Sequence, residues 1–510
     1  QQALVEQCSV IAEKDDIIAQ KDHTITKKDN RITYLLEQFR LAQLKQYGKS
    51  SEGHPSQGLL FDEAEALVEE AEAQEQLEEV KGHQRKKRGR TKLPEDLPRE
   101  TVIHDIPEHD KSCDCCGERL HQMGEDVSEQ LEFVPAKIKV IRNVRPKYSC
   151  RTCERTGTEV SIKIAPVPSM PIPKSIATPS LLAQIITSKY QYALPLYRQE
   201  SLFKQFGIEL GRKTMASWML RCSELFKPLY RRLQEVLLAQ PVIHADETTL
   251  VVAREDKAKC YMWLYCTGTD SPTGSELPNI VLYDYQASRG SEHPKNFLQG
   301  FRGYLQVDGY KGYEKTQATL VGCVAHARRY FSDAQKVLPK GKRSGKIDWA
   351  LNHIQKLYRI EKQLQGCLPH EKYERRQAEA KPLLEAFKAW LEKSVLQVPP
   401  KSALGKAIGY SLKQWPKLIR YIEDGQLNID NNRAERAIKP FVIGRKNWMM
   451  SQTANGANAS ATLYSIIETA KANGLEPFGY LTHLLKELPA LPEDANLEHL
   501  LPWKVTLPDN

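Results

Sequence analysis

The sequence predicts a multidomain α+β protein with a mixed α/β core, a helical insertion in that core and several smaller modules before it. Three observations lead to this fold class. The 510 residues are enough for three or more domains. Short β-like runs follow one another from Pro241 to His326, between long segments of helical periodicity. Two C-x-x-C pairs further upstream indicate a small module held by a metal.

Composition narrows the classes of protein further. The mean hydropathy is negative, and no apolar run reaches about 18 residues, so we expect no membrane-spanning helix. The net charge of +9 is modest, but the basic residues are clustered, as a polyanionic partner requires. The 11 cysteines suit a reducing compartment with a metal site better than a disulfide framework. The chain opens on Gln1 and shows no signal peptide, so we expect a trimmed product or a piece of a longer chain.

Residues 1–50 carry a heptad repeat. Apolar side chains recur every seventh residue at Leu4, Ile11, Ile18, Ile25, Ile32 and Phe39. The second position of this seam is weak, because Asp15, Asp22 and Asp29 occupy it. We therefore predict a helix that pairs chains as a weak coiled coil and makes the protein a homo-oligomer. A solvated amphipathic helix is the alternative.

Residues 51–94 combine an acidic and a basic stretch. The acidic, helix-like stretch runs from Leu59 to Val80 without lysine or arginine. It is followed by KGHQRKKRGRTKLP, which brings lysines and arginines together without one acid. Such a run either follows DNA phosphates and enters a minor groove through arginine, or it is a solvated linker. Both interpretations remain open.

Residues 95–165 contain the two close cysteine pairs. The four candidate ligands are Cys113, Cys116, Cys150 and Cys153. Residues 131–148 between the pairs alternate in the manner of a β-hairpin. Two thiolate pairs brought together by a hairpin give the tetrahedral S₄ coordination that suits structural Zn²⁺. Cys115 either substitutes for a neighbouring ligand or stays an unligated thiol.

Residues 166–238 are predicted to be helical and to contain a helix-turn-helix. A first helix ends at Gln205, a turn with two glycines follows, and a second helix starts near Arg212. In a DNA-binding helix-turn-helix the second helix enters the major groove, where Arg212 and Lys213 would meet phosphates or base edges. A plain helical bundle is the alternative.

Residues 239–334 and 426–455 are predicted to form the core. Three β-like runs, a polar helix-like segment and two further β-like runs predict a mixed sheet of the ribonuclease-H type. Asp246 falls on the first strand and Asp308 at the end of the fourth, so neighbouring strands would bring them together. Glu435 follows on a polar helix. Three such carboxylates suit two Mg²⁺ ions, although an aspartate at a strand end is more often a turn residue.

The rest of the chain is predicted to be helical. Residues 335–425 form a helical insertion between the fifth strand and the helix that carries Glu435. Residues 456–510 form a C-terminal helical segment.

Longer motifs around these acids resemble one known family. HADET around Asp246, VDGYKGY around Asp308, CVAHARRYF around His326 and NNRAERAIKPFVIGRKNW around Glu435 are similar to the transposases of the bacterial insertion-sequence family sixty-six. The resemblance extends over nearly the whole chain, through the CDCCGERL and YSCRTC module to NGANASATLYSIIETAKANGLEPFGYL. The segment before the cysteine module carries no usable family motif.

The resemblance implies a DDE transposase that binds the ends of its element and cleaves and joins double-stranded DNA. Asp246, Asp308 and Glu435 would hold two Mg²⁺ ions that activate water and then a 3′-hydroxyl. The resemblance also implies a cytoplasmic, nucleoid-associated bacterial protein with accessory proteins encoded by the same element. The chain has no G-x-x-x-x-G-K-[ST] loop, in agreement with a reaction that needs no nucleotide hydrolysis.

Basic residues beside the motifs are candidates for holding DNA phosphates, with ordinary surface charge as the alternative. They are His326, Arg328, Arg329, Arg445 and Lys446.

Two other functions stay open. A non-transposing nuclease or resolvase would share the metal chemistry of strand cutting. A DNA-binding regulator with an inactive core would have lost an acid, and all three acids are present.

Overall fold

The computed structural model describes most of the chain, in two compact units. The described residues are 2–47, 138–148 and 163–507, apart from 258, 269–277, 340–343 and 493. One unit comprises Gln1–Gln74 with Pro166–Asn510, and the other comprises Glu75–Ala165. The acidic and basic stretch and all the cysteines of the predicted zinc module lie outside the described residues.

The N-terminal heptad segment is a single helix, α1 (Gln2–Tyr47). Its seam lies in solvent, because the side chains of Ile18, Ile25, Ile32 and Phe39 are 54 to 60% exposed. Pairing of this seam with a second chain stays a prediction.

The smaller unit contains a two-stranded antiparallel ladder. Strand β1 (Lys147–Tyr148) pairs with β2 (Lys163–Ile164). The expected hairpin within residues 131–148 was therefore wrong for its described part, because residues 138–146 form no strand and β1 pairs with a segment beyond the second cysteine pair. Within the part of this unit that the structure describes, the alternating apolar residues pair with no strand, and Val140 and Val144 are largely exposed.

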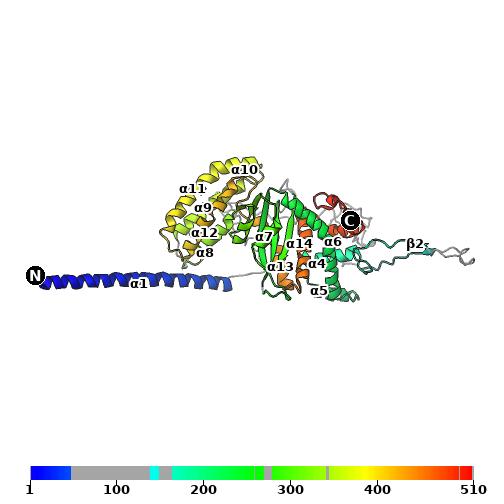
Figure 1. Cartoon of the computed structure of the whole chain (residues 1–510), viewed down its shortest axis with the longest axis horizontal. Helices are drawn as coiled ribbons and strands as arrows, with labels where there is room; N and C mark the ends of the chain where they lie inside the picture. Colours follow the sequence, from blue (N-terminus) through cyan, green and yellow to red (C-terminus); the bar gives the residue numbers. More distant parts are fainter. Residues whose placement is uncertain are drawn as a thin grey trace, which may run out of the picture. The chain divides into compact units, whose positions relative to one another are not determined.

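A five-stranded mixed sheet lies at the centre of the larger unit (Figure 1). Its strands are β3 (Val242–Leu250), β4 (Cys260–Cys266), β5 (Val281–Gln286), β6 (Tyr304–Gln306) and β7 (Thr319–Val321). The order is β5-β4-β3-β6-β7, antiparallel from β5 to β3 and parallel from β3 to β7. A short helix, α7 (Glu292–Phe297), and the turn η3 (Lys311–Lys315) precede β6 and β7 respectively. The predicted mixed α+β core is confirmed.

Two helices from the end of the chain cover the sheet. Helix α13 (Asn432–Trp448) packs on β3 and β4, and α14 (Ala454–Ala472) packs on β5. The hydroxyl oxygens of Ser465 and Thr469 accept hydrogen bonds from backbone N–H groups of β5, at 2.8 and 3.1 Å. These contacts satisfy the free edge of the sheet, which would otherwise be open to another strand.

The helices that precede the sheet in the chain and the helices that follow it pack with the sheet into one hydrophobic core. Before the sheet come α4 (Pro179–Tyr190), α5 (Leu196–Gln205) and α6 (Arg212–Leu238). After α14 come α15 (Pro477–Glu487) and the short turns η6 (Leu488–Ala490) and η7 (Glu498–Leu500). Helix α15 packs on α4, and α6 packs on α14. The C-terminal segment therefore completes the core around the sheet.

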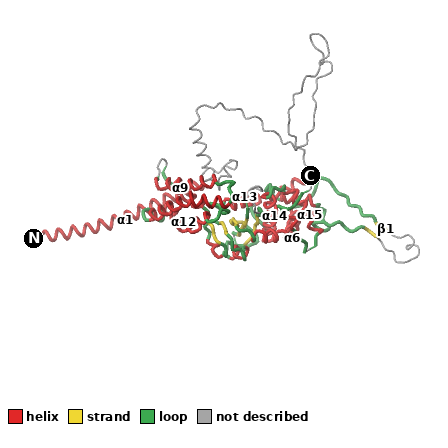
Figure 2. The backbone as a smooth tube through the Cα atoms, turned by 90° about the horizontal axis from the view of Figure 1, so that it is seen from above, coloured by secondary structure: helices red, strands yellow, loops and turns green. Residues whose placement is uncertain are grey.

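The predicted insertion is a helical subdomain whose hydrophobic core also includes Val242 of β3 and Val321 of β7. Its elements are α8 (Val324–Lys336), α9 (Gly345–Gln363), α10 (Pro369–Arg375), the π-helical turn η4 (Arg376–Ala380), α11 (Lys381–Val395), α12 (Ala403–Leu418) and η5 (Ile419–Ile422). Figure 2 shows the strands between this group of helices and the group that contains α6, α14 and α15. Among the described residues, no helix combines the length and apolar character needed to cross a membrane.

Candidate active site

Strand geometry decides which acid of the HADET motif faces α13. Successive side chains of a strand point to opposite faces, whereas residues paired across strands share a face. Asp246 pairs with Leu264, which pairs with Tyr283, and the Tyr283 hydroxyl donates a hydrogen bond to the Ala437 carbonyl of α13. Asp246 therefore lies on the α13 face. Its neighbour Glu247 lies on the opposite face.

Glu247 has its own partners on that opposite face. Its carboxylate pairs with the Arg289 guanidinium and accepts a hydrogen bond of 2.6 Å from the Tyr313 hydroxyl. Although it directly follows Asp246 in the sequence, it belongs to a separate buried contact.

The parallel pairing of β3 with β6 brings Asp308 beside Asp246. The last paired residues are His244 and Gln306, so each aspartate lies two residues beyond the same rung of the ladder. Asp246 lies within β3, which continues to Leu250 through its pairing with β4. Asp308 follows the end of β6, and its Oδ1 accepts a hydrogen bond of 2.7 Å from the Tyr310 N–H.

Glu435 comes to the same place from the first turn of α13, where its side chain is only 3% exposed. Burial raises its pKa to about 7, and the charges of Asp430 and Asp308 also raise it, against the opposing effect of Arg329. Burial likewise raises the pKa of Asp246 well above its ordinary value, with further contributions from Glu247, Glu435 and Asp308. The structure therefore brings all three predicted acids into one electrostatic cluster.

The turn before α13 is tied to both parallel strands. Asn431 contacts the imidazole of His244 at 3.1 Å and donates a hydrogen bond of 2.8 Å to the Ala245 carbonyl. The Gln306 amide donates a hydrogen bond of 2.7 Å to the Asp430 carbonyl. These contacts fix the start of α13 relative to β3 and β6, and with it the position of Glu435.

The insertion reaches the same turn through Tyr358 of α9. Its hydroxyl donates a hydrogen bond of 3.0 Å to the buried carboxylate of Asp430, which also accepts one of 3.1 Å from the Asn432 N–H. Sequence reasoning missed both residues. The polar run NIDNN just before the helix is the signal that would have pointed to Asp430, because buried polar residues must find partners. No comparable signal marks Tyr358.

His326 and Arg329 approach Glu435 from α8. We expected the fifth strand to extend to His326, and this was wrong, because β7 ends at Val321 and α8 begins at Val324. His326 and Arg329 are therefore one helical turn apart. His326 Nδ1 lies 3.4 Å from Glu435 Oε1, and an Arg329 amino nitrogen lies 3.5 Å from Glu435 Oε2. Burial, followed by the charge of Arg329, lowers the pKa of His326 to about 4, so its imidazole is neutral at physiological pH.

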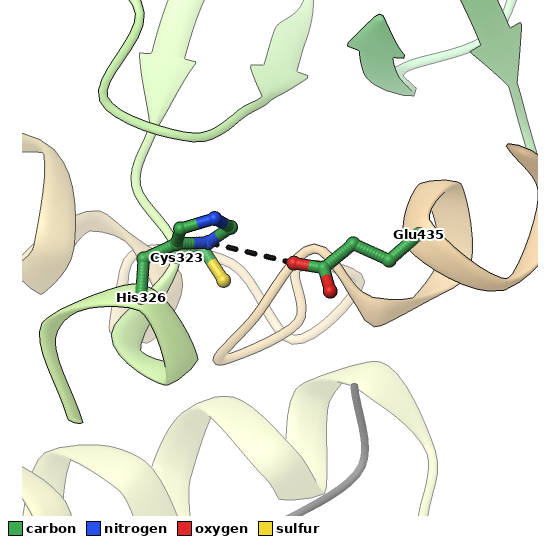
Figure 3. A group of neighbouring side chains, drawn as sticks. All are labelled: Cys323, His326 and Glu435. Carbon is green, nitrogen blue, oxygen red and sulfur yellow. Dashed lines mark ion pairs between the residues drawn. The ribbon is translucent and has the colours of Figure 1, made fainter. Parts of the chain in front are cut away.

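A cysteine that sequence reasoning passed over lies in this group. Cys323 is the N-cap residue of α8, and its Sγ accepts a hydrogen bond of 3.2 Å from the Asn431 N–H. Figure 3 shows Cys323, His326 and Glu435 turned toward one another. Their potential ligand atoms all lie within 4.8 Å of one another. The C-x-x-H spacing at a helix start is the signal that could have identified the pair.

The other predicted DNA contacts have different surroundings. Arg328 is buried, and its positive charge acts on Tyr358 inside the insertion. Arg445 donates a hydrogen bond of 2.9 Å to the Thr248 hydroxyl and ties α13 to β3, whereas Lys446 is exposed. Arg212 and Lys213 are exposed in the first turn of α6, which precedes the sheet in the chain.

Replacement of Glu435 should make the metal-free protein more stable at alkaline pH. A carboxyl whose pKa rises from 4.5 unfolded to about 7 folded contributes stability that is fully present below 4.5 and is lost as the pH rises through 7. Glu435→Gln should therefore raise the free energy of unfolding at pH 8 by on the order of 2 kcal/mol, with little effect at pH 5. Denaturant unfolding without divalent cations would measure this difference, and parallel pH profiles for both proteins would contradict it.

Comparison with known proteins gives these residues a family context. Residues 174–459, which include the sheet, all three acids and the insertion, match the model described as Transposase IS66 family. The chain belongs to the IS66 transposase family. Three further models of this family match residues 34–102 (Transposase C of IS166 homeodomain), 110–154 (zinc-finger binding domain of transposase IS66) and 465–503 (IS66 C-terminal element). The resemblance of the sequence motifs to this family is thus confirmed. The matches also support a DNA-processing transposase role and a structural zinc site.

Relatives of this IS66 family chain occur in Sinorhizobium fredii. The uncharacterized protein y4jD is 34% identical over 438 residues, which cover 83% of both chains. The uncharacterized protein y4hP is 33% identical over 443 residues, which cover 83% of this chain and 78% of the relative. No solved structure matches the chain.

Proposed function

We propose that the chain cleaves and joins DNA strands by DDE chemistry, with Asp246, Asp308 and Glu435 as the catalytic acids. The convergence of these three carboxylates at the edge of the parallel strands carries the proposal. The strand order β5-β4-β3-β6-β7 supports a ribonuclease-H-like core, because that order places the first and fourth strands of the domain side by side.

The donor set of the cluster fits magnesium. Mg²⁺ takes oxygen ligands, and three carboxylates from three elements supply them. Both carboxylate oxygens of Glu435 are buried without a hydrogen-bond partner among the described residues. When bound, two Mg²⁺ ions would activate a water or a 3′-hydroxyl and stabilise the leaving oxygen. The Asn431 and Asp430 contacts tie the start of α13, and with it Glu435, to β3 and β6.

Basic side chains beside the acids would position the DNA. Arg329 is partly exposed next to Glu435, and the neutral His326 can donate a hydrogen bond to a phosphate oxygen. Lys446 is exposed on the end of α13 and is a further candidate. Arg328 is buried beside the insertion, and Arg445 donates a hydrogen bond to Thr248 of β3. We therefore assign Arg328 to holding the insertion in place and Arg445 to holding α13 in place.

A reaction with terminal-repeat DNA tests the proposed function. The full chain, Mg²⁺ and a duplex that carries a candidate element end should yield both nicked and joined products. Nicked products alone would favour a nuclease or resolvase over a transposase. Binding without either product would favour a regulator.

The first turn of α6 should contribute to DNA binding. Arg212 and Lys213 are exposed after the turn that separates α5 from α6, so the double variant Arg212→Ala with Lys213→Ala should weaken terminal-repeat binding. The salt dependence should flatten by about one unit of slope for each phosphate group that the variant no longer binds. Exposed Arg221 and Lys227 further along α6 provide a control pair with the same charge change. Equal effects of both pairs would argue against a specific contact.

The cysteine module should hold zinc. The unmodified chain should contain tightly bound zinc, and Cys150→Ser should lower its content by about one ion per chain, because S₄ coordination needs all four thiolates. Metal analysis of the purified proteins measures this loss. An unchanged zinc content would remove Cys150 from the ligand set.

Two partner assignments rest on the sequence. We propose that the exposed seam of α1 pairs two chains. Accessory proteins from the same element, and association with the nucleoid, follow from the family resemblance.

A further inference from the structure

We propose that Cys323, His326 and Glu435 form a second cation site, which takes a thiophilic divalent ion such as Zn²⁺ or Co²⁺ and withdraws Glu435 from the magnesium cluster. The existence of this site depends only on the local geometry. Its inhibitory consequence rests on the proposed function.

Two helix starts meet at this site. Cys323 and His326 occupy the N-cap and N3 positions of α8, whose side chains face each other at the start of a helix. Glu435 comes from the first turn of α13. The Asn431 N–H at the start of α13 donates a hydrogen bond to Cys323 Sγ at 3.2 Å, which lowers the pKa of the thiol. Burial and the charges of Asp430 and Glu435 outweigh this effect and raise the pKa of Cys323 well above its ordinary value, so the thiolate needs a bound cation to form.

Unsatisfied buried atoms point into the space between the three side chains. His326 Nδ1, Glu435 Oε1 and Glu435 Oε2 are buried without a hydrogen-bond partner among the described residues. Their ion-pair partners lie at 3.4 and 3.5 Å, too long for good hydrogen bonds, so an ion or water would satisfy these buried atoms better. The donor set fits a metal ion, because imidazole nitrogen, thiolate sulfur and carboxylate oxygen are all cation ligands.

The spacing fits a tetrahedral ion after a small adjustment. The ligand atoms lie within 4.8 Å of one another. Bonds to zinc of about 2.0 to 2.3 Å separate neighbouring ligands by roughly 3.3 to 3.8 Å. The fourth position would face solvent, because the His326 side chain is 23% exposed. A set with sulfur and nitrogen favours zinc or cobalt over magnesium, which takes oxygen ligands.

Arg329 is the resident cation that the metal ion would replace. It lies 3.5 Å from Glu435 Oε2 and 3.4 Å from His326 Nε2. Its side chain is 37% exposed, so the guanidinium can move into water when an ion binds. His326 Nε2 can then carry the ring proton and leave Nδ1 free for the ion.

Metal counting on the full chain tests the site. Proteins reconstituted with Co²⁺ should retain one cobalt ion per chain more in the unmodified protein than in Cys323→Ala. The Cys222→Ala control, which removes another buried free thiol, should show no such decrease. Arg329→Gln should tighten cobalt binding, because it removes the competing charge. Equal cobalt content in Cys323→Ala and the unmodified chain, or weaker binding in Arg329→Gln, would overturn the proposal.

Strand cleavage tests the consequence separately. Zn²⁺ should inhibit Mg²⁺-dependent cleavage by the unmodified chain, and Cys323→Ala should need at least about 100-fold more Zn²⁺ for the same inhibition. Equal zinc sensitivity would contradict the withdrawal of Glu435. If the chain cleaves no DNA, the cobalt count still decides whether the site exists, so failure of the proposed function and failure of the site are distinguishable.

Discussion

Asp246→Asn, Asp308→Asn and Glu435→Gln should each lower the rate of strand cleavage by at least about 1,000-fold, which corresponds to about 4 kcal/mol of activation free energy. Each substitution keeps the size of the side chain and removes the charge that holds a metal ion. Binding of terminal-repeat DNA should change little, because basic residues elsewhere supply most of its affinity. Gel-based cleavage and binding assays on the same protein preparations measure the two effects.

Asp284→Asn is the matched control for these variants. Asp284 also lies on the sheet, and burial raises its pKa to about 6. It pairs with Trp263 on β4, so it faces away from Asp246 and α13. Its replacement should leave cleavage within a few-fold of the unmodified chain. Magnesium-dependent cleavage that persists in any one of the three acid variants would remove that residue from the catalytic set.

Apolar patterning made the core of this protein predictable. The strands of the sheet are short buried runs, and β4 is buried along almost its whole length. A fourth strand that returns parallel to the first must place their carboxyl ends together, so the meeting of Asp246 and Asp308 follows from strand order. Glu435 was predictable mainly through its motif, because a long insertion separates its helix from the sheet.

The contacts that position Glu435 were not predictable from the sequence. His244 and Asn431 are 187 residues apart, and no local pattern links them. The run TLVGCVAH predicted a fifth strand that includes Cys323, whereas in the structure Cys323 is the N-cap residue of α8. Backbone hydrogen bonding decides that boundary, because the Gly322 N–H donates to the Lys417 carbonyl of α12 and ends the pairing of β7.

The burial of Arg376 was also not predictable from the sequence. No sequence pattern distinguishes Arg376 from its neighbour Arg375, since both lie in a charged helical run. In the structure Arg376 is 2% exposed, whereas Arg375 lies on the surface. The difference arises because Arg376, at the start of η4, faces the backbone carbonyls of Tyr421, Asp424 and Leu427.

Arg376→Ala should destabilise the protein by about 3 to 5 kcal/mol, because it leaves the partly buried Glu361 carboxylate and three backbone carbonyls without their partner. The Arg376 guanidinium binds both oxygens of Glu361, at 2.9 and 2.6 Å. It also donates to the carbonyls of Tyr421, Asp424 and Leu427 at 2.9 to 3.0 Å. Arg376→Lys should recover only part of the stability, because an ammonium group cannot reach all of these acceptors in the same fixed geometry.

Arg375→Ala is the control, with an expected destabilisation of about 0 to 1 kcal/mol, because its pair with Glu379 is exposed. Denaturant unfolding compares the free energy of unfolding of the variants. The carbonyls held by Arg376 belong to the segment that leads directly into Asp430, Asn431 and the start of α13. Arg376→Lys should therefore also slow cleavage at temperatures where the protein stays folded. A fully folded Arg376→Lys protein with unchanged cleavage would show that the insertion stabilises the fold without positioning Glu435.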